Sequence, residues 1–213
     1  MDKILYTSQQ KYLQGLRKKP DPVLVEIEEF AKAKKVPILN WNAAELLEIL
    51  ISAQRPKRVL EIGTAIGYSS IIIARKLKKK GKLDTIEKSE DNINLALENF
   101  QKADVSERIN LIEGDALNIM PALDQKYDFI FLDADKEDYE KLFYYSLMLL
   151  NKGGVLFVDN LLWHGYAAGS KVPNAYKEST QHIRNFNKLF ISQDALRTVI
   201  LPVGDGIGLG IKM

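Results

Sequence analysis

Short apolar runs alternate with amphipathic stretches along most of this chain of 213 residues. After residue 55, five apolar runs of strand length are separated by segments with helical period. Apolar strands that alternate with helices in this way predict a parallel sheet with helices on both faces. The five predicted strands cover Arg58–Ile62, Leu83–Glu87, Ile109–Glu113, Asp128–Leu132 and Val155–Asp159.

The last part of the chain predicts a different strand pairing. Two more apolar runs cover Leu196–Leu201 and Gly206–Lys212, and the residues between them, 202–205, are typical of a turn. We therefore expect an antiparallel hairpin that ends an otherwise parallel α/β sheet of seven strands. The helices expected between the strands include Asp91–Ala103, Lys136–Leu150 and a segment near Tyr176–Phe190.

The first 55 residues carry helical patterns. An amphipathic helix is predicted over Ser8–Lys18, and a second over Pro22–Lys34 with Asp21 as its cap. A third helix begins near Asn42 and carries an apolar face. We expect one domain over residues 1–213, in which 1–55 form a helical N-terminal segment and 56–213 form the α/β core.

Composition narrows the classes of function. Hydrophobic residues make up 46% of the chain and charged residues 27%, as in ordinary globular proteins. No apolar run approaches the roughly 20 residues that span a bilayer, and the polar N-terminus lacks an apolar signal core, so we expect a cytoplasmic protein without a membrane partner. The absence of cysteine excludes disulfides and thiolate metal sites. The net charge of +2 is too small to indicate nucleic-acid binding by itself.

Two glycines follow the first predicted strand. Gly63 and Gly67 lie at the edge where open α/β sheets bind ligands. A dinucleotide-binding turn requires glycine at positions 63, 65 and 68, but Ala65 and Tyr68 occupy two of them. This departure weakens the hypothesis of an NAD-dependent oxidoreductase and favours a cofactor without a pyrophosphate. The alternative is a tight turn that binds no ligand.

The next two predicted strands end close to acidic residues. Glu87 closes the second strand, where a carboxylate suits the hydroxyls of a ribose. Asp115 and Ala116 follow the third strand, in position to contact an adenine edge. Two alternatives stay open: Glu87 is a solvated acid at a strand end, or Asp115 caps the next helix.

Oxygen ligands follow the fourth and fifth strands. Asp133 comes after one strand, and Asp159 and Asn160 end the other, so the three side chains are expected to converge on one crevice. Such hard ligands suit Mg²⁺, Ca²⁺ or Mn²⁺. Lys136 is a candidate general base beside them. A divalent metal next to a nucleoside cofactor indicates methyl transfer. In the alternative interpretation, Asp133 and Asp159 are acids of the kind that commonly end strands in α/β proteins, and Lys136 faces solvent.

The remaining charged residues suggest no catalytic role. His164 and His182 are the two histidines of the chain, and we expect both to be structural or peripheral. Basic residues cluster at 17–19, 32–35 and 76–82. In one interpretation the cations at 76–82 complement the dipole at a helix end, and in the other they bind RNA phosphates.

The motifs resemble those of the metal-dependent class I O-methyltransferases, which include the catechol and caffeoyl-CoA O-methyltransferases. The resemblance covers nearly the whole chain and implies the Rossmann-like class I methyltransferase fold of that family. Its most specific parts are Leu60-Glu61-Ile62-Gly63-Thr64-Ala65-Ile66-Gly67-Tyr68-Ser69, Leu132-Asp133-Ala134-Asp135-Lys136 and Asp159-Asn160-Leu161-Leu162-Trp163-His164-Gly165.

The resemblance also implies a role for each motif. The residues that would contact S-adenosylmethionine are Glu61, Gly63, Tyr68, Ser69, Glu87, Asp115, Ala116 and Asp133. The residues that would bind Mg²⁺ are Asp133, Asp159 and Asn160. Catalysis would then fall to Lys136, as the base, and to Asp133 beside it.

Two kinds of acceptor fit this chemistry. A catechol-like small molecule offers adjacent oxygens, and we expect an O-methyltransferase that acts on one hydroxyl of such a pair. The chain is also similar to bacterial enzymes that methylate 5-hydroxyuridine in tRNA, through Val36-Pro37-Ile38 and the Pro-Val-Gly-Asp-Gly segment near the end. Methylation of tRNA is therefore the first alternative function. Two alternatives from other classes of function are an NAD-dependent oxidoreductase and a nucleic-acid-binding module without catalytic activity. We also expect a homodimer, as is frequent in the family.

Overall fold

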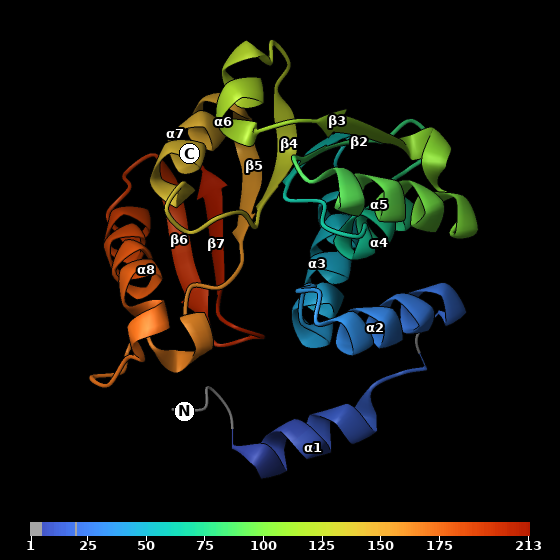
Figure 1. Ribbon diagram of the computed structural model, residues 1–213. Helices are drawn as coiled ribbons and strands as arrows, with labels where there is room; N and C mark the ends of the chain where they lie inside the picture. The colour runs from blue at the N-terminus through green and yellow to red at the C-terminus, as the bar shows by residue number, and fades with distance from the viewer. Residues whose placement is uncertain (1–5, 20) are drawn as a thin grey trace.

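The computed structural model describes residues 6–19 and 21–213, and a seven-stranded sheet runs through its centre (Figure 1). The strands lie in the order β3-β2-β1-β4-β5-β7-β6, and β7 is antiparallel to both of its neighbours while the other pairs are parallel. This arrangement confirms the predicted fold and its C-terminal hairpin. The strands are β1 Arg58–Ile62, β2 Lys82–Glu87, β3 Ile109–Glu113, β4 Tyr127–Leu132, β5 Leu150–Val158, β6 Leu196–Leu201 and β7 Ile207–Lys212.

The two faces of the sheet bury two hydrophobic clusters, because successive residues of a strand point to opposite faces. On β1, Val59 packs in the cluster with α3, α4 and α5, whereas Leu60 and Ile62 pack in the cluster with α7 and α8. The same two helical layers flank the sheet in Figure 1. The helices are α1 Thr7–Leu16, α2 Pro22–Lys34, α3 Trp41–Gln54, α4 Tyr68–Lys76, α5 Glu90–Lys102, α6 Ala116–Ile119, α7 Tyr139–Leu149 and α8 Lys177–Ile191. Within the described ranges, no helix is long and apolar enough to cross a membrane.

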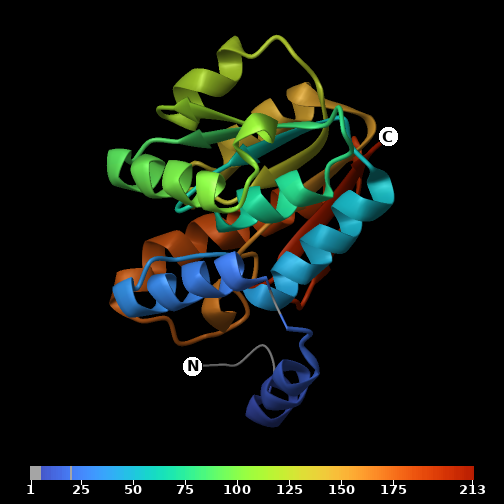
Figure 2. The same cartoon turned by 90° about the vertical axis from the view of Figure 1, so that its right-hand side faces the viewer.

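The N-terminal helices lie close to their predicted positions. Asp21 caps α2, because its side chain accepts a hydrogen bond of 2.9 Å from the backbone nitrogen of Val23. None of the residues of α1 is buried, and α1 lies apart from the body of the protein in two perpendicular views (Figure 1, Figure 2). Its large side chains Tyr12 and Leu16 are 67% and 63% exposed. The homodimer expected from the family resemblance stays a prediction.

One predicted helix begins later than the sequence pattern indicated. The helix predicted over Lys136–Leu150 is α7, which begins at Tyr139 and is preceded by a turn at residues 136–138. The backbone nitrogen of Asp138 donates to the carbonyl of Asp135 at 3.1 Å and helps close this turn. Lys136 therefore lies in the connection between β4 and α7 rather than on the helix.

Candidate active site

The carboxyl ends of β1 to β5 border a cavity of about 810 Å³, which we call the central cavity. Hydrogen bonds join the neighbouring strand ends: the backbone nitrogen of Asp133 donates to the carbonyl of Ile62 at 2.9 Å, and that of Asp159 donates to the carbonyl of Leu132 at 3.1 Å. The side chains that follow different strands therefore meet at one edge of the sheet. The predicted site residues that line the cavity are Gly63, Glu87, Asp115, Ala116, Asp133, Lys136, Asp159 and Asn160.

The turn after β1 needs glycine for packing reasons as well as for ligand access. Gly63 has a φ of +99°, and a Cβ there would lie 1.8 Å from the carbonyl oxygen of Asp133. Gly67 has a φ of +86°, and its Cβ would lie 2.6 Å from the ring of Phe100. Any side chain at either position would displace backbone or core atoms, so the glycines fix how closely β1, β4 and α5 approach.

Glu87 holds the backbone together at one end of the central cavity. Its carboxylate accepts hydrogen bonds from the backbone nitrogens of Ala65 at 2.8 Å, Lys88 at 3.0 Å and Ser89 at 2.9 Å. These contacts hold the turn after β1, in which Ala65 has a positive φ of 46°. Asp115 accepts from the backbone nitrogen of Leu117 at 2.8 Å and caps α6, while also lining the cavity. Asp115 therefore caps α6 and also faces the space in which a ligand would bind.

Three residues of the predicted cofactor set do not line the central cavity. Glu61 is completely buried, and its carboxylate accepts hydrogen bonds from the hydroxyls of Thr85, at 2.7 Å, and of Ser70. Burial raises the pKa of Glu61 to about 7. Tyr68 is buried and donates its hydroxyl to Glu28 at 2.5 Å, and Ser69 is also buried. Contact of these three residues with a cofactor stays a prediction.

The predicted catalytic and metal-binding residues converge around the Lys136 ammonium. Its three N–H donors are shared among four oxygen acceptors: the side-chain oxygens of Asn160 at 2.6 Å, Tyr139 at 2.7 Å and Asp133 at 3.0 Å, and the carbonyl of Ala134 at 2.9 Å. The Tyr139 hydroxyl also donates to the carbonyl of Asp159 at 3.1 Å. The turn before α7 is thus tied to the ends of both β4 and β5.

The electrostatics of this cluster suit a cation. Asp159 is 3% exposed, and burial together with the nearby charge of Asp133 raises its pKa to about 8. The Lys136 ammonium already stands as a positive charge between Asp133 and Asn160. In the described part of the chain no group of three or more His, Cys, Asp or Glu residues suits a metal, but the predicted set takes its third ligand from an amide. Its two carboxylates and amide oxygen are hard donors, which fit Mg²⁺.

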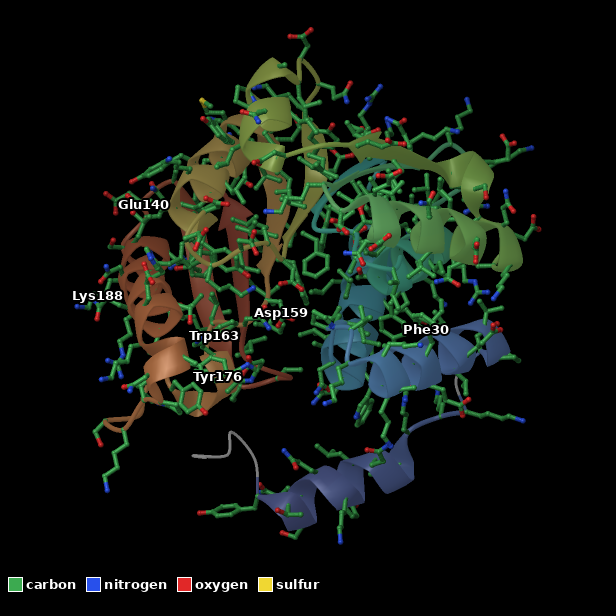
Figure 3. All side chains as sticks on the ribbon, viewed as in Figure 1. Phe30, Glu140, Asp159, Trp163, Tyr176 and Lys188 are labelled. Carbon is green, nitrogen blue, oxygen red and sulfur yellow. The ribbon has the colours of Figure 1, made fainter. Side chains whose placement is uncertain are left out.

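The far end of the central cavity is lined by residues that follow β5 and by the start of α8. Trp163 donates its indole nitrogen to the Ser179 hydroxyl at 3.0 Å, and its ring centroid lies 5.5 Å from the Lys136 nitrogen. In Figure 3 Trp163 is labelled near Asp159 and beside Tyr176, whose ring centroid is 6.3 Å from that of Trp163. Of these two rings only that of Trp163 lines the central cavity, next to Lys136, and we call it the aromatic wall of the site.

His164 and His182, which we expected to be structural or peripheral, both line the central cavity. The backbone nitrogen of His164 donates to the Asp205 carboxylate at 2.5 Å, and its φ is +57°. Trp163 and Asn160 also have positive φ values, of 46° and 66°. Backbone strain of this kind gathers at functional sites, where surrounding contacts hold it in place.

Sequence reasoning missed several residues of this site. Tyr139 lies inside a predicted amphipathic helix, where a tyrosine is expected to be a buried core residue. Asp205 lies in the predicted turn between the last strands, where an aspartate is an ordinary turn residue, and burial raises its pKa. Glu178 and Ser179 belong to a helix with no motif. A spacing signal exists only for Tyr139, which follows Lys136 by three residues.

The basic clusters lie in different surroundings. Lys80 and Lys82 line a separate cavity of about 450 Å³ with Lys57 and Arg58, at the amino-terminal edge of the strands and away from the central cavity. Arg17 pairs with Glu28 at 2.6 Å. Lys32 and Lys35 line a shallow pocket with Pro37 and Ile38, and these last two residues also border the central cavity. The cluster at 32–35 therefore lies beside residues at the edge of the central cavity.

Comparison with known proteins assigns the family. The O-methyltransferase family model matches residues 17–213. A caffeoyl-CoA O-methyltransferase from Populus kitakamiensis is 34% identical over 176 residues, which cover 79% of this chain and 75% of that protein. The structure of a putative caffeoyl-CoA O-methyltransferase from Staphylococcus aureus superposes with a TM-score of 0.89 at 31% identity, over 96% of this chain and 99% of the other.

A second solved structure carries a bound cofactor. The O-methyltransferase TomG from Streptomyces achromogenes, in complex with S-adenosylmethionine, superposes with a TM-score of 0.85 at 28% identity, over 100% of this chain and 99% of that one. These findings confirm the resemblance that the sequence motifs indicated and argue against an NAD-dependent oxidoreductase. The chain belongs to the O-methyltransferase family.

Proposed function

We propose that this O-methyltransferase uses S-adenosylmethionine and a divalent metal to methylate one hydroxyl of a vicinal oxygen pair in a small molecule. The observation that carries the proposal is the convergence of Asp133, Asp159 and Asn160 on the cavity that also holds Lys136 and the aromatic wall. Metal-assisted methyl transfer needs an acid at a strand end to bind the cofactor, oxygen ligands to hold the metal, and a lysine close to those ligands to take the proton.

The proposed binding of S-adenosylmethionine rests on Glu87 and Asp115. Both line the central cavity at the ends of neighbouring strands, at the edge where open α/β sheets bind nucleosides. The bound S-adenosylmethionine of TomG supports the same cofactor here. Glu87 would accept the ribose hydroxyls, while its contact with Ala65 keeps the turn after β1 in place.

The reaction transfers a methyl group from sulfur to oxygen. The methyl–sulfur bond breaks as the oxygen–methyl bond forms, and the hydroxyl proton leaves to a base. Asp133, Asp159 and Asn160 would hold a divalent cation, which lowers the pKa of an acceptor hydroxyl when bound. Lys136 would receive the proton as the neutral amine and become an ammonium, and its nitrogen lies within hydrogen-bond reach of Asp133 and Asn160. Holding both substrates in line contributes on the order of 7–11 kcal/mol to lowering the barrier.

The test is methylation of catechol by the purified protein, first freed of metal by EDTA and then supplied with Mg²⁺. We expect turnover to disappear with EDTA and to return with Mg²⁺. Asp159→Asn should lose turnover and keep S-adenosylmethionine binding, whereas the control Asp124→Asn, an exposed aspartate outside the cavity, should keep both. Full turnover by the chelated wild type would refute the metal assignment.

A tRNA acceptor is the second candidate, and one observation favours it. Lys32 and Lys35 lie next to Pro37 and Ile38, at the mouth of the central cavity, where they are placed to contact a phosphate backbone. Mass spectrometry of tRNA nucleosides after incubation with the enzyme tests this candidate directly. Loss of modification in a Lys32→Ala, Lys35→Ala double variant would support it, and a lack of modification by the wild type would exclude it.

A further inference from the structure

The central cavity is strongly acidic. Eight carboxylates line it against two ammonium groups, which leaves six uncompensated negative charges when both histidines are neutral. The acidic residues are Glu87, Asp115, Asp133, Asp135, Glu137, Asp138, Asp159 and Glu178, and the lysines are Lys88 and Lys136.

Both lysines of the cavity are already engaged. The ammonium of Lys88 lies 2.6 Å from the Asp135 carboxylate, and that of Lys136 donates to Asp133 at 3.0 Å. Even with a cationic cofactor and a divalent metal bound, the carboxylates outnumber the positive charges. An acceptor that carries several phosphate groups would bring more negative charge to this wall, and among the described lining residues no lysine or arginine is free to pair with it.

One of the carboxylates borders the acceptor end. Glu178 lies in the first turn of α8, next to Ser179, whose hydroxyl accepts a hydrogen bond from Trp163. Trp163 in turn stacks near the Lys136 nitrogen, at 5.5 Å. Glu178 itself is exposed, and within residues 6–19 and 21–213 its carboxylate has no hydrogen bond or ion pair. It is therefore free to meet the part of an acceptor that extends beyond the aromatic wall.

We propose that the acceptor is a small phenol whose side chain is neutral or positively charged, and that Glu178 determines this charge preference. The inference rests on the proposed methyl transfer and names its substrate class. A coenzyme A thioester carries phosphate groups, so the proposed class does not include the acceptor for which the caffeoyl-CoA relatives are named. The same argument disfavours tRNA, because the lysines near the mouth lie outside the acidic cavity.

A simpler role for Glu178 is available, and a matched variant separates the two. A carboxylate in the first turn of a helix complements the helix dipole. Glu140 has the same place in α7, is also exposed, and does not line the central cavity. Glu140→Gln therefore loses the same interaction with a helix terminus without changing the charge of the site. A dipole role predicts equal effects of the two substitutions, and a substrate role predicts an effect of Glu178→Gln alone.

The experiment compares three compounds that share the catechol ring and differ in the charge of the substituent: 3,4-dihydroxyphenethylamine is a cation, 4-methylcatechol is neutral and 3,4-dihydroxybenzoate is an anion. Caffeoyl-CoA serves as the polyanion. Methylation rates and equilibrium binding to the protein saturated with S-adenosylhomocysteine and Mg²⁺ are both measured. We expect the amine and the neutral catechol to have higher kcat/KM than the carboxylate, and caffeoyl-CoA to be the poorest. Glu178→Gln should lower the amine-to-carboxylate ratio about three- to fivefold, as for an exposed charge pair, and Glu178→Lys should lower it further. Glu140→Gln should leave it unchanged.

Each outcome bears on one of the two proposals. Preference for the carboxylate or for caffeoyl-CoA by the wild type, or an unchanged ratio in both Glu178 variants, would overturn the charge inference while leaving methyl transfer intact. Binding that follows the expected charge order without any methylation would support the inference and refute the proposed function. Absence of both binding and methylation for every compound would overturn both.

Discussion

Replacement of Glu61 by glutamine tests the buried polar network beneath the turn after β1. Glu61 is completely buried, and burial raises its pKa from 4.5 to about 7. Between these two values the folded protein keeps a proton that the unfolded chain has lost. The free energy of unfolding therefore falls as the pH rises through this window and levels off above a pH of about 7.

The magnitude follows from the size of the shift. At about 1.4 kcal/mol for each pKa unit, the change from 4.5 to about 7 corresponds to at most about 3 to 4 kcal/mol. Glutamine keeps the shape of the side chain and its contacts with the hydroxyls of Ser70 and Thr85, but does not titrate. We expect the wild type to lose up to that amount of stability between pH 5 and pH 8, relative to Glu61→Gln.

The assay is urea unfolding followed by circular dichroism at several pH values, on metal-free protein. Asp159 also has a raised pKa and contributes a fall of the same sign, so the quantity of interest is the difference between wild type and variant. Glu113→Gln, an exposed glutamate at the end of β3, is the control and should follow the wild type. If the difference in the free energy of unfolding between the wild type and Glu61→Gln does not vary with pH, the reasoning is refuted.

Three further predictions concern the site itself. Glu87→Ala should weaken S-adenosylmethionine binding about tenfold or more, because a charged hydrogen-bond acceptor contributes about 1.5–3 kcal/mol; calorimetry that finds unchanged affinity would contradict its role. Asn160→Ala should abolish turnover and spare cofactor binding, and retained turnover at saturating Mg²⁺ would remove Asn160 from the ligand set. Tyr139→Phe keeps the ring packing against Phe186, at 5.2 Å between centroids, but loses the hydroxyl that accepts from Lys136. It should lower kcat more than it lowers thermal stability, and an equal kcat would show that the hydroxyl does not position Lys136.

The strands were predictable because their apolar runs are short and separated by clear breaks. The end of β1 and the end of β4 fall where the sequence pattern placed them, at Ile62 and Leu132. The start of α7 was not predictable from periodicity, since Lys136, Glu137 and Asp138 are acceptable helix residues. The hydrogen bonds of Lys136 to the ends of two strands hold it in a turn instead, and such tertiary contacts are invisible to a local pattern.

The candidate site was predictable where residues follow strands and hidden where they come from elsewhere. Glu87, Asp133 and Asp159 could be found because carboxyl ends of parallel strands share an edge. Glu178 and His182 reach the same cavity from α8, which lies far along the chain and carries no motif. Their places depend on how α8 packs on the sheet, and a single sequence does not encode that packing in any local spacing.

The measurement that tests the central claim most directly compares catechol with resorcinol, which differ only in whether the two hydroxyls are adjacent. Each is incubated with the enzyme, Mg²⁺ and S-adenosylmethionine that carries a deuterated methyl group, and the product is analysed by mass spectrometry. If Asp133, Asp159 and Asn160 hold a metal that engages a vicinal oxygen pair, catechol will gain one labelled methyl group and resorcinol will gain none at a comparable rate. Equal labelling of the two, with or without Mg²⁺, would contradict the account.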